Sequence, residues 1–179
     1  MTALNKEQYP VGKFEMPDQV SRDMFLQWIS EIAAFPERIS NEVKSLTDAQ
    51  LDTPYRDGGW TLRQVVHHCA DSHINAVCRI KLALTEEKPV IKPYAEASWA
   101  ELSDGKTYPI DASLAILKGL HERWAILLEN CGEEDLQKVF IHPEHSREIS
   151  IGEVTGLYAW HCRHHLAHIT TLKAAKGWS

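Results

Sequence analysis

The chain has 179 residues, of which 44% are hydrophobic and 25% are charged, so it is predicted to form one globular domain (1–179) rather than a disordered protein. The 25 acidic residues outnumber the 19 basic ones and give a formal net charge of −6, which disfavours nucleic acid and anionic membranes as partners. Four cysteines without CxxC spacing, no apolar signal core and no stretch of about 18 apolar residues predict a reduced, cytoplasmic protein that does not span a membrane.

Two amphipathic helices are predicted in the first half of the chain. The first, residues 21–46, has apolar residues spaced three and four apart, and Pro36 should kink or split it because proline removes a helical hydrogen bond. The second, residues 61–85, begins with the capping box Thr61–Gln64, directly after a Gly-Gly turn.

Two further helices are predicted in the second half. The third covers residues 112–130 and has His121 within its apolar stripe. The fourth begins with a second capping box, Ser150–Glu153, and ends near Lys176, where Gly177 is a suitable terminating residue.

The connections between these helices complete the predicted fold. Glu86–Ile110 contains three prolines and is longer than a bundle connection needs, so we expect a crossover that covers one end or side of the bundle. Val139–Ile149 alternates weakly and is compatible with a short hairpin before the fourth helix. The predicted fold class is an all-α four-helix bundle with one long crossover between helices 2 and 3, an architecture that places metal sites between facing helices.

Histidine is unusually frequent, with ten residues in the chain, and seven of them lie within the second and fourth predicted helices. His161 and His165 are four residues apart, so their side chains differ by only about 40° around the helix axis. They share a face with Leu157 and Leu172, which predicts that both imidazoles point inward. An i, i+4 histidine pair is the spacing by which a helix presents two nitrogens to one divalent ion.

A catalytic zinc site needs a third protein ligand and keeps one position open for water or substrate. His68 is the best third ligand, because it lies at the edge of the apolar stripe of the second helix, whereas His67 should point outward and pair with Asp71 at the surface. The alternative is that these histidines are core or surface residues with ordinary hydrogen bonds. Two histidines in one buried stripe with a third on a facing helix favour metal binding over that alternative.

Two long motifs carry a resemblance to a known family. DTPYRDGGWTLRQVVHHCADSH (52–73) and GLYAWHCRHHLAHIT (156–170), with KPYAEASW between them and GW near the end, closely resemble the YfiT-like branch of the DinB superfamily. The resemblance covers nearly the whole chain. It implies a four-helix bundle of unusual handedness, a homodimer, and a metal ion held by His68, His161 and His165. The DinB name implies no DNA chemistry.

The other polar residues near the predicted site can each be interpreted in two ways, as part of the site or as ordinary structural residues. Asp71 could accept a hydrogen bond from a ligating histidine or pair with His67, and His121 could reach the site or be a satisfied core residue. His164 and His168 are candidate acid or base groups on the same terms. No role in metal binding is predicted for the other four histidines, and Cys69 and Cys162 are interpreted as packing residues. Those four are His67, His73, His142 and His145.

Three functions are compatible with such a site. In the first, a hydrolase activates water on the metal, with Asp71, His164 or His168 as its base, since Cys162 occupies the place of the glutamate in HExxH. In the second, a bacillithiol-type S-transferase delivers a low-molecular-weight thiol to a small-molecule substrate, and in the third the chain is a non-enzymatic metal-binding module. We predict one divalent ion per chain, zinc by default, although nickel or iron also suits imidazole ligands.

Overall fold

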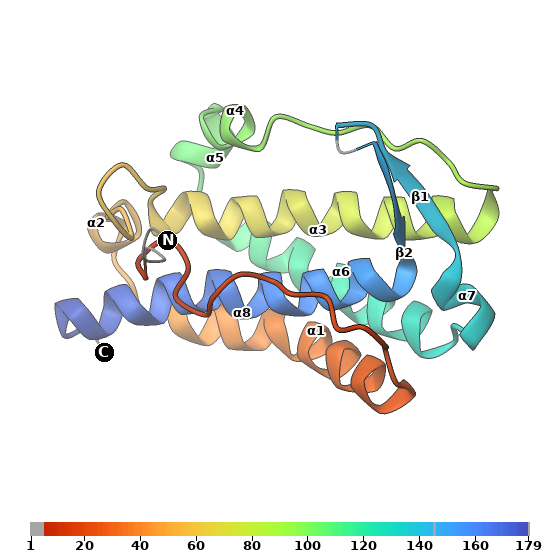
Figure 1. Ribbon diagram of the computed structural model, residues 1–179. Helices are drawn as coiled ribbons and strands as arrows, with labels where there is room; N and C mark the ends of the chain where they lie inside the picture. Colours follow the sequence, from red (N-terminus) through yellow and green to blue (C-terminus); the bar gives the residue numbers. More distant parts are fainter. Residues whose placement is uncertain (1–5, 145, 179) are drawn as a thin grey trace, which may run out of the picture.

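The computed structural model describes residues 6–144 and 146–178, and its main feature is a bundle of four long helices (Figure 1). The helices α1 and α3 each pack against both α6 and α8, so the predicted all-α four-helix bundle is confirmed. None of the helices in the described residues is long and apolar enough to cross a membrane. The bundle consists of α1 (Arg22–Val43), α3 (Leu62–Thr85), α6 (Asp111–Glu129) and α8 (Ile151–Lys176).

Shorter elements fill the connections. The hairpin before α8 is present as two antiparallel strands, with Val139 opposite Ser150. The crossover from α3 to α6 runs over α3 and is joined to the hairpin by a parallel bridge between Val90 and Ile141 (Figure 1). The shorter elements are α2 (Asp48–Leu51), α4 (Glu96–Ala100), α5 (Ser103–Lys106), α7 (Glu133–Gln137), β1 (Val139–His142) and β2 (Arg147–Ser150). His145 lies outside the described residues.

Capping residues account for where the long helices begin and end. The Thr61–Gln64 capping box of α3 forms in full, as predicted. The capping box predicted at Ser150 has one of its two hydrogen bonds. The Ser150 hydroxyl accepts from the backbone N–H of Glu153, but the Glu153 carboxylate pairs with Arg147 and not with the backbone of Ser150. Gly177 ends α8 with a φ of 65°, a left-handed conformation that favours glycine.

The helix α1 continues through Pro36, so the predicted split at this residue is wrong. Pro36 is buried, and its missing N–H leaves the carbonyl of Ile32 without its helical donor. His121 on α6 supplies the missing hydrogen bond, from Nδ1 to that carbonyl at 2.6 Å. A side chain of a neighbouring helix therefore compensates for the proline.

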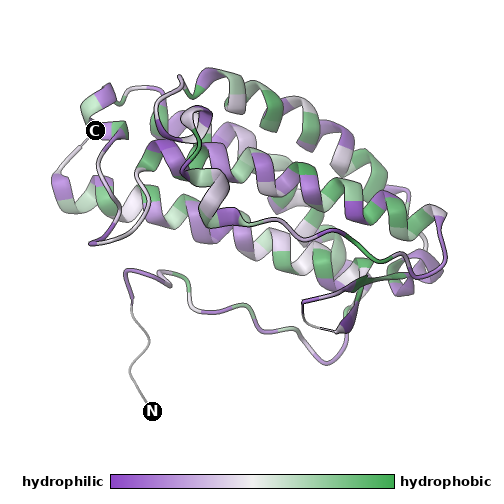
Figure 2. Cartoon of the chain, turned by 90° about the horizontal axis from the view of Figure 1, so that it is seen from above, coloured by the Kyte–Doolittle hydropathy of each residue, from purple (hydrophilic) through white to green (hydrophobic). Residues whose placement is uncertain are grey.

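The long helices enclose one apolar core, to which each of them contributes buried side chains (Figure 2). Gly156 allows α8 to approach α1 closely, since a Cβ atom there would lie 2.8 Å from the Trp28 ring. Residues before α1 run along α8 (Figure 1), where Trp160 Nε1 donates to the carbonyl of Gly12. The N-terminal segment thereby forms one wall of the space beside α8.

Candidate metal centre

Three histidines from two helices meet at one point of the structure. His161 and His165 lie on α8 and His68 lies on α3, and each offers a ring nitrogen within 4.8 Å of the other two. His68 and His165 are buried, and His161 is partly exposed. The structure thus brings together the three residues that the sequence analysis selected.

The spacing of the nitrogens fits a metal ion. Two ligand nitrogens about 2.05 Å from a tetrahedral ion lie about 3.3 Å apart. The Nε2 atoms of His68 and His161 are 3.3 Å apart. The donor set of three imidazoles also suits zinc, nickel and iron.

Burial keeps these imidazoles neutral, which is the form that binds metal. Desolvation lowers the pKa of His68 to about 4, with a smaller contribution from His164 and His168. Desolvation also holds the pKa of His161 and His165 well below the usual value, and neighbouring histidines lower it further.

The three histidines line a cleft of about 960 Å³ that is open to solvent. Its walls are rich in aromatic side chains from several segments, and three arginines also line it. A volume of this size is suited to a small-molecule substrate. The aromatic lining residues include Tyr9, Phe14, Tyr55, Trp60 and Trp160, and the arginines are Arg56, Arg79 and Arg147.

His164 and His168, the candidate acid and base groups, line the same cleft. Their ring nitrogens lie within 4.8 Å of that of His165, so the two groups border the candidate metal centre. His164 stacks on Trp160 with a centroid distance of 4.5 Å, and His168 stacks on Tyr55 at 3.9 Å. Desolvation lowers the pKa of both histidines to about 4.

Asp71 does not take the place predicted for it. Asn75 Nδ2 donates to the backbone carbonyl of Asp71, and no histidine side chain in the described part of the chain donates to the Asp71 carboxylate. Burial raises the pKa of its carboxyl group, and Asp104 raises it further. The predicted surface pair with His67 is also wrong, because His67 is buried and its ring bonds to Ser113 Oγ and the carbonyl of Tyr108.

Two histidines with no predicted role lie near the site. His73 is fully buried and its Nε2 atom lies 3.0 Å from Nδ1 of His161. His142 is the last residue of β1 and lines the cleft. The sequence offered one signal for His73, since it lies four residues after Cys69 and four before Val77 on the buried stripe of α3.

The cysteines beside the ligands are packing residues, as predicted. Cys69 and Cys162 are buried in the core, at 0% and 3% exposure. Burial raises the pKa of both thiols well above the usual value. Neither thiol is therefore available as a nucleophile in the cleft.

The fold and the site define a four-helix bundle with a candidate three-histidine metal centre in the wall of an open cleft. The DinB superfamily model matches residues 31–169, and the chain belongs to this superfamily. A relative from Oceanobacillus iheyensis, named "Putative metal-dependent hydrolase", is 51% identical over 96% of this chain and 99% of its own length. "Putative metal-dependent hydrolase YfiT" from Bacillus subtilis is 46% identical over 100% of both chains.

A solved structure supports the same relationship. YfiT from Bacillus subtilis superposes with a TM-score of 0.96 at 46% identity, covering 98% of this chain and 100% of that chain. It is described as "a probable metal-dependent hydrolase with an unusual four-helix bundle topology". The chain therefore has the same fold as YfiT and is similar to it in sequence over nearly its whole length.

Proposed function

We propose that this chain is a metal-dependent hydrolase that holds one divalent ion through a ring nitrogen each of His68, His161 and His165. The observation that carries the proposal is the meeting of three neutral imidazoles in the wall of a cleft, with two Nε2 atoms 3.3 Å apart. The names of the relatives support the same reaction class. Three protein ligands leave a position open, which favours a catalytic over a structural ion.

A divalent ion held by these histidines would act as a Lewis acid and would lower the pKa of a water molecule bound to it to near 7. The base that receives the proton is proposed to be His168. Its Nε2 atom lies 3.3 Å from the carbonyl of Gln8, so Nε2 donates there and Nδ1 keeps a lone pair. His164 is the alternative, because it lies in the same group of ring nitrogens.

The walls of the cleft suit a substrate with an apolar part. Trp60 packs against His68 with a centroid distance of 4.7 Å, and Phe14 packs against Trp160 at 6.4 Å. These rings line the same cleft as the three histidines and would orient a substrate within it. We propose zinc as the ion, and nickel or iron as ions that the same ligands accept.

Metal analysis of the purified protein tests the proposal. We expect about one divalent ion per chain, and we expect His68→Ala, His161→Ala and His165→Ala each to lose it, because two imidazoles hold an ion poorly. The control is His67→Gln, since His67 neighbours a ligand but bonds to Ser113 and Tyr108. An unchanged metal content in the three alanine variants would contradict the assignment.

A metal-dependent thiol S-transferase is the second candidate function. It is favoured by the residue at position 162, where the HExxH motif has its glutamate base and this chain has a buried cysteine. A thiolate is itself the nucleophile, so this reaction asks less of a protein base. The substrate would then be a low-molecular-weight thiol together with an electrophile.

An electrophile panel with and without added thiol separates these functions. Metal-dependent turnover in water alone supports the hydrolase, and turnover that requires the thiol supports the transferase. No turnover in either condition, with the metal site filled, supports a non-enzymatic metal-binding module.

A further inference from the structure

A series of three hydrogen bonds connects the candidate metal centre to the interior of the bundle. His161 Nδ1 lies 3.0 Å from Nε2 of His73, and His73 Nδ1 lies 2.7 Å from Nε2 of His121. The series ends on α1, where His121 Nδ1 lies 2.6 Å from the carbonyl oxygen of Ile32. Both His73 and His121 are 0% exposed. We call the residues Ile32, His121, His73 and His161 the histidine relay.

The carbonyl at the end of the relay determines where each proton lies. A carbonyl can only accept, so His121 donates from Nδ1, and its Nε2 atom, unprotonated in the neutral ring, accepts from His73. The same argument applied to His73 makes its Nε2 atom an acceptor for Nδ1–H of His161. His161 is therefore protonated at Nδ1, and its Nε2 atom has a free lone pair.

That lone pair faces the candidate metal centre. Nε2 of His161 is the atom that lies 3.3 Å from Nε2 of His68. Of the two tautomers of His161, the relay thus selects the one that can bind an ion at this point. The other tautomer of His161 has its proton on Nε2, where it would point toward His68. Its unprotonated Nδ1 would then face the unprotonated Nε2 of His73, and two lone pairs would repel each other.

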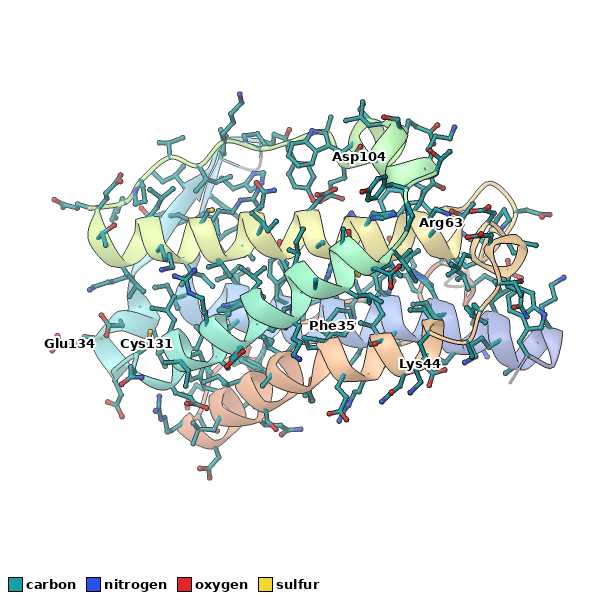
Figure 3. The ribbon with its side chains drawn as sticks, turned by 180° about the vertical axis from the view of Figure 1, so that it is seen from behind. Phe35, Lys44, Arg63, Asp104, Cys131 and Glu134 are labelled. Atoms are coloured by element: carbon teal, nitrogen blue, oxygen red, sulfur yellow. The ribbon has the colours of Figure 1, made fainter. Side chains whose placement is uncertain are left out.

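Pro36 makes the carbonyl of Ile32 available for this purpose. In an uninterrupted helix the N–H of residue 36 would occupy that carbonyl, and proline has none. Ile32 is 0% exposed, so a solvent molecule is a poor substitute for the missing donor. Aromatic rings enclose the relay from the side, with Phe35 (Figure 3) 5.4 Å from His73 and 5.7 Å from His121 between ring centroids.

We propose that His73 and His121 are positioning residues of the metal centre, which hold His161 in the tautomer and orientation that present Nε2 to the ion. This inference rests on the proposed metal centre. Hydrogen-bonded partners of metal ligands commonly act in this way, and their loss weakens metal binding by about 10–100-fold. The histidine relay differs from a single hydrogen-bonded partner, because the backbone carbonyl of Ile32 at its far end fixes which nitrogen of each histidine is the donor.

The affinity for Zn²⁺, measured by competition with a chromophoric chelator, is the first test. We expect His73→Phe to bind Zn²⁺ about 10–100-fold more weakly than the wild type, because the His161 Nδ1–H loses its acceptor. The control His67→Gln removes another buried imidazole of α3 and should leave the affinity unchanged. Equal affinities of the wild type and His73→Phe would overturn the proposal.

A pair of variants at His121 separates positioning from folding. His121→Gln can donate to Ile32 and accept from His73, so it should retain Zn²⁺ affinity to a greater extent than His121→Leu. The double variant Pro36→Ala/His121→Leu restores the helical donor for Ile32, and we expect it to fold and still bind Zn²⁺ weakly. A wild-type affinity in this double variant would show that His121 serves the fold alone and would overturn its positioning role.

Nitrogen NMR of the metal-free protein, labelled at histidine, provides a readout that does not need metal. We expect His161, His73 and His121 all to be protonated at Nδ1 in the wild type, and His161 to lose this single tautomer in His73→Phe. Protonation of wild-type His161 at Nε2 would overturn the proposal. A wild type that binds no Zn²⁺ would instead contradict the proposed function, and the tautomers of the metal-free protein would still decide whether the relay exists.

Discussion

Individual side chains in this bundle are polar in places where a core is usually apolar. Among the described residues, seven histidines are buried, and Arg63 is 4% exposed. Each has partners or a neighbouring ring: Arg63 pairs with Asp48 and Asp52 and donates to the carbonyl of Tyr108. Arg63 is consequently engaged by the protein and is a poor anchor for an anionic substrate.

Thiol reactivity is a prediction at this scale. Cys78 is the exposed thiol, while Cys69, Cys131 and Cys162 are buried. In the native protein we expect a disulfide reagent such as DTNB to modify one thiol rapidly and all four after unfolding, because thiolate formation requires access to solvent. Cys78→Ser should abolish the rapid phase, and rapid modification that persists in this variant would contradict the burial of one of the other three thiols.

At the scale of elements, the contact between α1 and α8 depends on one missing side chain. The backbone of Gly156 lies against the ring of Trp28, which is 8% exposed. The ring is enclosed by both helices, so it has little room to move away. This contact holds α8, and with it His161 and His165, at a fixed distance from α1.

Replacement of this glycine by alanine should destabilise the protein. The added Cβ would lie 2.8 Å from the Trp28 ring, and such overpacking costs about 1–3 kcal/mol. Urea unfolding followed by tryptophan fluorescence measures the change. The control Gly119→Ala, where nothing lies within 4 Å of the new Cβ, should stabilise α6 by about 0.5–1 kcal/mol. A Gly156→Ala protein as stable as the wild type would show that α8 can shift away from α1.

Elements were predictable from local signals, and contacts between them were not. Spacing and capping residues predicted all four long helices, and the i, i+4 spacing predicted that His161 and His165 act together. His73 was missed because it lies five residues after His68, a rotation of about 140°, so helix geometry alone separates the two. The His73 imidazole reaches the site through the opposite nitrogen of His161, a relation that requires the packing of α3 against α8.

Across the whole molecule, the buried histidines couple stability to pH. In the metal-free protein, burial lowers the pKa of His68, His121, His164 and His168 to about 4, against about 6.5 in an unfolded chain. Between these values the unfolded chain binds protons that the folded chain does not. The free energy of unfolding therefore falls as the pH falls from 6.5 to 4, by up to about 1.4 kcal/mol per pH unit for each proton taken up.

Acid unfolding of the metal-free protein measures this coupling. We expect urea unfolding at pH 7, 6, 5 and 4.5 to show a steady loss of stability, and His164→Gln to reduce the slope by up to one proton. Equal free energies of unfolding at pH 7 and pH 5 would contradict the burial of neutral histidines.

The homodimer implied by the family resemblance and the cytoplasmic location stay predictions at this scale.

The position of Pro36 has a consequence for how the chain folds. Most helical hydrogen bonds join residues four apart and can form before any tertiary structure exists. The carbonyl of Ile32 instead accepts from His121, a donor 89 positions away in the sequence. The first helix makes the last of these hydrogen bonds when α6 docks, so we expect the segment around Pro36 to become fully ordered only as the bundle assembles.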